Sequence, residues 1–295
     1  MPECKNVEVF RKSHTISFRF LQRIIKELEL HSLKKIIIAG SESDAYSSAL
    51  QRYGSELDHH IVVTNSDGLS GAAVVIHGIV PNGSIEQIVF IKDFLYMAFV
   101  EDLLNYEHPT TDDKFQLNIG FYYIFHELGH VVEYQTSFET YGYCSPDKVF
   151  YLRYEYKEYI LGQAMQLWSE YFAESLAVAV APNATKNSIG DIIEYLNRTV
   201  YPDELPAQLN HSYFVAYFLV HYLASLHYRG ENLPSLTSIE NNSILAGYQE
   251  PFEIISETLL DLYARRGEWN FQDDSLRFSE AYSSLIIYER NAYSL

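Results

Sequence analysis

Apolar residues recur at helical spacing through much of the chain. Between residues 16 and 30 they fall at Phe18, Leu21, Ile24, Ile25 and Leu28, which predicts an amphipathic helix. The same reasoning predicts helices over residues 43–53, 93–106, 115–134, 149–181 (with a break expected at Gly162), 189–197, 211–228, 251–265 and 275–291.

Short β-branched and apolar runs predict strands over residues 34–39, 61–64, 72–80 and 85–91. The last two are joined by Pro81-Asn82-Gly83-Ser84, and Asn-Gly favours the positive φ values of a tight hairpin turn. We therefore expect an α+β fold in one domain over residues 1–295. A small N-terminal mixed sheet with helices would occupy about 1–92, and a mainly helical lobe about 93–295.

The most informative stretch is His126-Glu127-Leu128-Gly129-His130, inside the predicted helix 115–134. Two histidines four residues apart lie about 40° from one another around a helix, so both rings can reach one metal ion. Glu127 is rotated by about 100° from His126, where it borders the metal without having to bind it. That arrangement suits a catalytic zinc site, in which a carboxylate takes a proton from metal-bound water.

This H-E-x-x-H pattern resembles the signature of the zincin superfamily of zinc metallopeptidases. The resemblance implies a zincin-like fold, a Zn²⁺ cofactor bound by His126 and His130, and Glu127 as the general base that cleaves a protein or peptide substrate. It also implies a third protein ligand. One branch of the superfamily takes it from H-E-x-x-H-x-x-G-x-x-H, but Glu133 and Thr136 stand in the last two positions, which excludes that branch.

A downstream glutamate is the other common third ligand, and Trp168-Ser169-Glu170-Tyr171-Phe172-Ala173-Glu174 offers two. They share one face of an otherwise apolar helix, where carboxylates are costly unless a cation or donor meets them. This spacing resembles the Glu-zincin pattern, which implies that Glu170 binds zinc and that Glu174 orients His126 or His130 through a hydrogen bond.

Several alternatives stay open for these glutamates. The two could exchange roles, or lie on a solvated stripe while Glu133, Glu139 or Asp147 supplies the ligand. The best-known Glu-zincins also carry Asn before the ligand and Asp four residues after it, where this chain has Ser169 and Glu174.

Other parts of the site are less sharply indicated. Candidate donors for a developing oxyanion are His211, Tyr213, His221, Tyr141 and Tyr143. A strand at 72–80 or 85–91 could bind an extended peptide by adding it to the sheet. In that case His77 would flank the cleft, although a histidine of this hairpin is more simply expected to face solvent.

Composition narrows the functional class. The 295 residues are 47% hydrophobic and 20% charged, as in globular proteins, and the formal net charge is −18. No cluster of Lys and Arg is present, so we expect neither nucleic acid nor a membrane surface as a partner. Two cysteines, no signal peptide in residues 1–20 and no apolar run of membrane length lead us to expect a cytoplasmic protein.

Two functions without hydrolysis, and one hydrolase of a different substrate class, are alternatives to a peptidase. A zinc-binding regulatory module or a peptide-binding module of zincin fold would need no general base, so the intact Glu127 favours an enzyme. A hydrolase acting on a small amide would carry the same motif as a peptidase.

Overall fold

The computed structural model describes residues 7–9, 15–39, 62–63, 73–79, 83–107, 119–141, 156–184, 188–236, 243–266, 268 and 270–293. The chain forms two compact units. Unit 1 comprises Met1–Cys144 and Leu176–Thr185, and unit 2 comprises Ser145–Ser175 and Lys186–Leu295. The division differs from the expected boundary near residue 92, because two helices after that point belong with the sheet.

Unit 1 contains a five-stranded mixed sheet of order β1-β2-β5-β4-β3. Its strands are β1 (Val7–Val9), β2 (Leu33–Ala39), β3 (Val62–Val63), β4 (Ala73–Ile79) and β5 (Ile85–Lys92). β1, β2 and β5 run parallel, whereas β4 is antiparallel to both β5 and β3. This confirms the predicted mixed sheet and the α+β class.

β4 and β5 form the hairpin that the Asn-Gly pair predicts. Their register runs from Ala73 opposite Ile91 to Ile79 opposite Ile85, and Gly83 in the connection has a φ of 81°. β5 pairs on both sides and β4 also pairs with β3 at two positions, so neither is a bare edge strand. The expectation that residues 85–91 offer an edge for peptide addition is therefore wrong.

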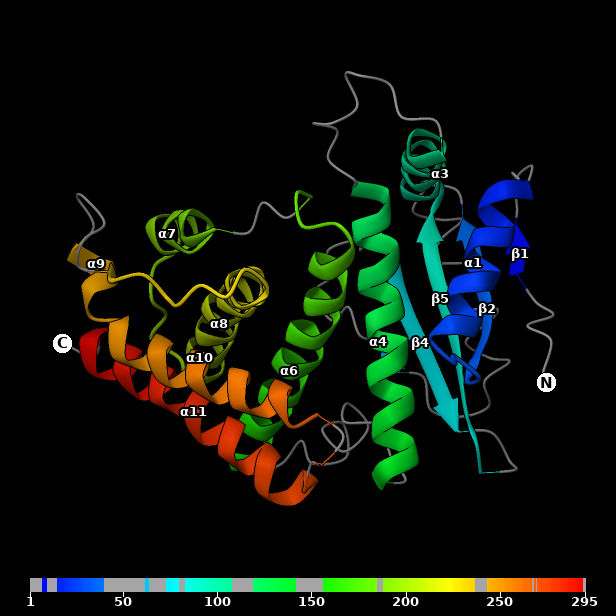
Figure 1. Cartoon of the computed structure of the whole chain (residues 1–295). Helices are drawn as coiled ribbons and strands as arrows, with labels where there is room; N and C mark the ends of the chain where they lie inside the picture. The colour runs from blue at the N-terminus through cyan, green and yellow to red at the C-terminus, as the bar shows by residue number, and fades with distance from the viewer. Residues whose placement is uncertain are drawn as a thin grey trace. The chain divides into compact units, whose positions relative to one another are not determined.

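In the described part of unit 1, the complete helices are α1 (Thr15–Glu27), α3 (Asp93–Glu107) and α4 (Ile119–Tyr141). Ile36, Val75 and Val89 of the sheet share one apolar cluster with these helices. Ile37 and Phe90 point to the opposite face and are also fully buried. Figure 1 shows α4 running beside β4, and the two elements are in contact.

α3 and α4 approach each other unusually closely at Gly120. A Cβ atom placed there would collide with backbone atoms of Phe99 and Ala98. The rings of Phe99 and Phe121 meet edge to face beside this point, with centroids 5.2 Å apart. The missing side chain of Gly120 therefore sets the distance between the two helices.

The regular elements that the structure describes in unit 2 are all helices (Figure 1). It holds most of α6 (Tyr156–Val180), together with α7 (Ile189–Arg198), α8 (Leu205–Tyr228), α9 (Ser243–Ala246), α10 (Gln249–Ala264) and α11 (Phe271–Tyr293). α8 packs against α7, α10 and α11. Its fully buried residues include Val215, Leu219 and Leu223.

The predicted helices are present wherever the structure describes them, but several ends differ. α4 continues to Tyr141, beyond the predicted end at residue 134, and α6 is unbroken at Gly162. α8 begins at Leu205 because Pro206 is tolerated in a first turn. The short helix α9 was not predicted, and the predicted helix at 43–53 lies outside the described residues.

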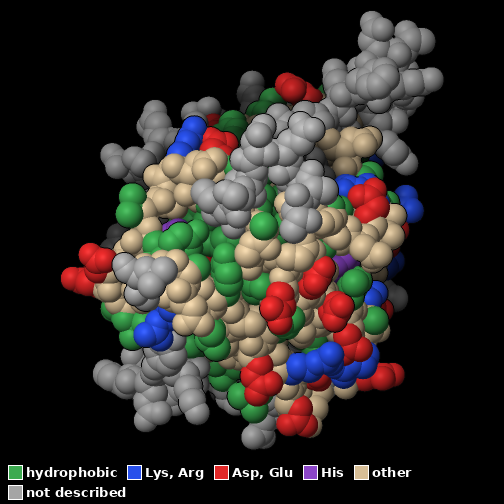
Figure 2. Space-filling model, turned by 90° about the vertical axis from the view of Figure 1, so that its left-hand side faces the viewer, with side chains coloured by type: hydrophobic (Ala, Val, Ile, Leu, Met, Phe, Trp, Pro, Cys, Tyr) green, Lys and Arg blue, Asp and Glu red, His purple; other side chains and the backbone are tan. Residues whose placement is uncertain are grey.

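Surface character agrees with the acidic composition. Figure 2 shows a face on which acidic side chains are more prominent than basic ones, in keeping with the formal net charge of −18. Among the helices that the structure describes, none combines the length and apolarity needed to cross a bilayer.

Replacing Gly120 by alanine should destabilise unit 1. The new methyl group would force α3 and α4 apart, which should lower the free energy of unfolding by about 1–3 kcal/mol. Urea denaturation followed by circular dichroism measures this. Gly190→Ala is the matched control, because a Cβ atom there meets only the Ser188 hydroxyl at 3.0 Å, and we expect a change within about 1 kcal/mol. Equal stability of the two variants would contradict the proposed close contact.

Candidate metal centre

α4 brings two imidazoles together in unit 1. The ring centroids of His126 and His130 lie 4.9 Å apart, with the rings nearly perpendicular. His130 is 3% exposed and Glu127 is 7% exposed, whereas His126 is only half-buried. The structure thus confirms the helical placement of the motif, with one ring open enough to meet a ligand.

The N-terminus of α4 is held by a side chain from α3. One Asp102 carboxylate oxygen accepts hydrogen bonds from the backbone N–H groups of Gly120, at 2.7 Å, and Phe121, at 3.1 Å. Burial raises the pKa of Asp102, and these two hydrogen bonds partly offset that rise. Asp102 therefore caps the helix whose next turns carry His126 and His130.

The other half of α4 is tied to the sheet. The Gln87 side-chain amide on β5 donates to the Val131 carbonyl at 2.9 Å and to the Ser32 hydroxyl at 2.8 Å. The carbonyl oxygen of the Gln135 side chain accepts from the same Ser32 hydroxyl at 2.7 Å. With Asp102 at the start of the helix, this network fixes α4 on both sides of the histidines.

His77 is buried beneath α4, and the expectation that it faces solvent is wrong. Its side chain, on β4, is completely inaccessible, and its ring centroid lies 4.8 Å from that of Tyr134. Tyr134 in turn stacks on His130, at 5.8 Å and an interplanar angle of 22°. The sequence signal for this placement was the alternation along β4, which puts His77 on the same face as Ala73 and Val75.

Glu170 and Glu174 lie on one face of α6, in its unit 2 portion. Glu174 is completely buried, and the Glu170 side chain is 14% exposed. The alternative of a solvated stripe is therefore wrong. Which of the two glutamates would bind a metal stays a prediction, as does the part assigned to Glu133. That residue is 3% exposed and accepts a hydrogen bond from the Ser137 hydroxyl at 2.8 Å.

His221 on α8 faces both of these glutamates within unit 2. Its Nε2 lies 3.5 Å from Glu170 Oε2 and 3.9 Å from Glu174 Oε2. Its Nδ1 lies 2.8 Å from the Tyr217 carbonyl oxygen, one turn earlier on α8. Only a protonated nitrogen can make that short contact, so the N–H of the ring sits on Nδ1.

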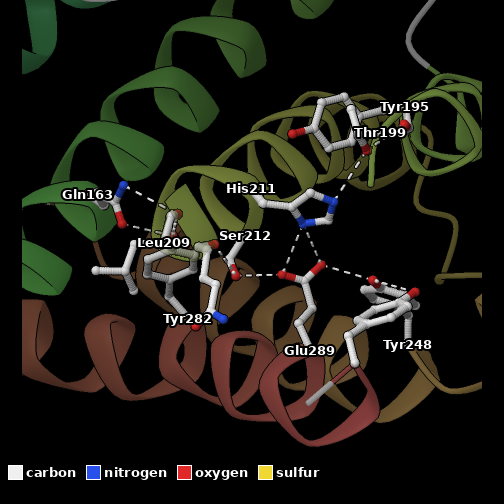
Figure 3. Close-up of polar contacts among 11 residues, drawn as sticks. Gln163, Tyr195, Thr199, Leu209, His211, Ser212, Tyr248, Tyr282 and Glu289 are labelled. Atoms are coloured by element: carbon white, nitrogen blue, oxygen red, sulfur yellow. Dashed lines mark hydrogen bonds and ion pairs between the residues drawn. The ribbon is translucent and has the colours of Figure 1, made fainter. Parts of the chain in front are cut away.

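His211 is held in a buried polar network elsewhere on α8 (Figure 3). Its Nδ1 lies 3.3 Å from a Glu289 carboxylate oxygen, and its Nε2 lies 3.3 Å from the Thr199 hydroxyl. The Glu289 carboxylate also accepts hydrogen bonds from the hydroxyls of Ser212, at 2.5 Å, and Tyr248, at 2.8 Å. These contacts account for His211 as a structural residue.

The remaining oxyanion candidates fall in different places. Tyr213 is buried in unit 2, where its ring meets those of Phe214 and Tyr217. Tyr143 lies outside the described residues, as does the side chain of Tyr141. Among the candidates whose side chains the structure describes, His221 is the one that faces the two glutamates.

A further histidine of α8, His227, contacts Tyr171, the residue next to Glu170. His227 Nδ1 lies 2.6 Å from the Tyr171 hydroxyl, and its Nε2 lies 3.0 Å from the Ser256 hydroxyl on α10. Burial lowers the pKa of His227 to about 4, so the ring is neutral near pH 7. Burial likewise raises the pKa of Tyr171, which stays a hydrogen-bond donor. α6 is thus fixed to α8 and α10 beside Glu170.

Imidazole nitrogens, as in His126 and His130, and carboxylates, as in Glu170 and Glu174, are ligand types that zinc accepts. Searches of protein-family models, of curated proteins and of solved structures found no match to this chain.

The low pKa of His227 predicts a pH-dependent stability of unit 2. In the unfolded chain this ring binds a proton below a pH of about 6.5, whereas the folded ring does so only near pH 4. The unfolded state therefore binds more protons in that window, and stability falls as the pH drops through it, by roughly 1 kcal/mol after allowance for solvent screening. Urea denaturation followed by tryptophan fluorescence should show this, since Trp168 and Trp269 both lie in unit 2.

His227→Gln should flatten that pH dependence, since glutamine does not titrate. His31→Gln replaces an exposed histidine of unit 1 and should leave the slope unchanged. A slope in His227→Gln as steep as in the wild type would show that this ring is not the group that titrates.

Proposed function

We propose that the chain is a zinc-dependent metallopeptidase of the zincin type. In this proposal His126, His130 and Glu170 hold the metal ion, and Glu127 is the general base. The observation that carries it is the paired imidazoles of α4 with the buried Glu127 between them in sequence. A structural metal site has no use for a carboxylate at that position.

The composition of the site adds support. Two combinations of described side chains have the donors to hold a metal ion: His126, His130 and Glu170, and His126, Glu174 and His221. The first is the set that the sequence resemblance implies.

The continuity of α6 supports a metal site that takes ligands from both α4 and α6. This helix is unbroken, and its last residues, from Leu176 onward, belong to unit 1. Leu176 packs against the apolar cluster that contains Leu128 and Val131 of α4. Glu174 precedes Leu176 by two residues, and Glu170 by six, which is ~9 Å along a helix axis. Glu170 and Glu174 therefore belong to the same continuous helix as residues that pack within unit 1.

In the proposed reaction each residue of the site has a separate role. A bound zinc ion would supply Lewis-acid polarisation of a peptide carbonyl and lower the pKa of water at the site. Glu127 accepts the proton of the attacking water and passes it to the leaving amine. Glu174 orients one of the two imidazoles by accepting its N–H. The neutral His221 ring donates its Nδ1–H to the Tyr217 carbonyl, so it has no N–H left on Nε2 for a developing oxyanion.

Glu127→Gln should separate chemistry from metal binding. Glutamine keeps the size of the side chain but cannot accept the proton, so hydrolysis should fall by several orders of magnitude while the zinc content stays near one ion per chain. Cleavage of a peptide library and elemental analysis measure the two effects. Glu257→Gln, an exposed change on α10, is the control. Native cleavage rates in Glu127→Gln would exclude Glu127 as the base, and zinc binding without any cleavage in the wild type would favour a non-hydrolytic module.

Glu170→Ala should lower the zinc affinity far more than Glu174→Ala. Loss of a direct ligand should remove most of the zinc affinity at the His126–His130 site. Loss of a residue that only orients a histidine should weaken binding by roughly 10- to 100-fold. Competition with a chromophoric chelator gives both affinities. The reverse order would show that the two glutamates have exchanged roles.

A further inference from the structure

We propose that Tyr134 is a positioning residue for His130: its ring, backed by His77 of the sheet, fixes the orientation of that imidazole before a metal ion binds. All three residues belong to unit 1. The inference rests on the proposed function, because orienting His130 matters only if this imidazole is a metal ligand.

Tyr134 follows His130 by one helical turn on α4. A side chain on an α-helix leans over the turn that precedes it, so the Tyr134 ring covers His130. The two rings stack, with centroids 5.8 Å apart and an interplanar angle of 22°. Tyr134 is 1% exposed and His130 is 3% exposed, and a close-packed interior leaves such rings little room to change rotamer.

His77 backs the Tyr134 ring from the sheet. The centroids of these two rings lie 4.8 Å apart, and the rings are inclined by 47°. His77 is completely inaccessible, and its backbone position on β4 pairs with Val62 of β3 and with Gln87 of β5. Because His77 is held from both neighbouring strands, it is a fixed support for the Tyr134 ring.

The residue opposite His77 in the sheet holds the same turn of α4. Directly opposed residues of antiparallel strands point to the same face of a sheet, and Gln87 is the residue opposite His77. Its side-chain amide donates to the carbonyl of Val131, the residue after His130, at 2.9 Å. The pair thus fixes both the backbone beside His130 and the ring stacked on it. A ligand held in this way needs little ordering when an ion arrives, which favours binding.

The two histidines of the motif differ in their support. His126 is half-buried and lies beside Tyr122, which is itself half-buried, with ring centroids 6.2 Å apart and an angle of 38°. We therefore expect His130 to keep its orientation with and without metal. His126, whose ring is nearly perpendicular to that of His130, is expected to adjust to the ion.

Cobalt titration of the full chain tests the proposal, because the visible bands of bound Co²⁺ report the geometry of its ligands and need no substrate. Tyr134→Leu removes the ring but keeps an apolar side chain. It should weaken Zn²⁺ binding, measured by competition with a chromophoric chelator, by roughly 10-fold or more and alter the cobalt bands. Tyr134→Phe keeps the ring and should retain the wild-type affinity and spectrum. Phe99→Leu is the matched control, since it removes an equally buried ring of unit 1 and should lower stability without changing either readout.

The outcomes separate this proposal from the proposed function. Wild-type affinity and cobalt bands in Tyr134→Leu would overturn the positioning role and leave the metal site in place. Equal losses in Tyr134→Leu and Phe99→Leu would also overturn it, since general packing would then govern the site. Equal losses in Tyr134→Leu and Tyr134→Phe would do the same by assigning the effect to the hydroxyl group. A wild type that binds neither ion overturns both proposals.

His77→Leu decides the question if Tyr134→Leu does not fold. Loss of the supporting ring should weaken zinc binding and alter the cobalt bands. Wild-type values in His77→Leu would contradict the proposed support from the sheet.

Discussion

The cost of burying carboxylates on helices governs much of this structure. Glu289 meets the cost with hydroxyl donors from Ser212 and Tyr248 and a ring nitrogen of His211. Asp102 meets it with two backbone N–H groups at the start of α4. Both are closed arrangements, with oxygen atoms at hydrogen-bond distance from their donors. Glu170 and Glu174 on α6 carry the same cost, and the His221 Nε2 lies 3.5 Å and 3.9 Å from their Oε2 atoms.

The closed arrangements stabilise the packing of the helices that carry them. A carboxylate whose donors are all in place has little to gain from a further ligand. The closed networks therefore make a rigid frame: Asp102 and Gln87 hold α4, and His227 holds Tyr171 on α6. Rigid support of this kind is what a metal centre needs from its surroundings.

Within the part of the chain that the structure describes, sequence periodicity predicted every strand except β1 and most helices, because their apolar faces are regular. It also singled out His126, His130, Glu170 and Glu174, since ionisable residues stand out within apolar helices. Periodicity did not predict contacts between residues that are far apart in the sequence. The pairing of His211 with Glu289 spans 78 positions, and the close approach of Gly120 to Phe99 has no local signature. The burial of His77 was readable from strand alternation, but the hairpin position suggested solvent.

The burial of Asp102 could have been predicted from the spacing of apolar residues along α3. It shares the buried face of α3 with Leu95 and Phe99, so its phase alone marks a carboxylate that needs donors. Glu289 gave a weaker signal, because α11 mixes serine, tyrosine and charged residues along its length. A buried carboxylate is thus visible in sequence only when its helix is otherwise apolar. Whether it serves packing or binds a ligand depends on the distance to its partners, which periodicity does not contain.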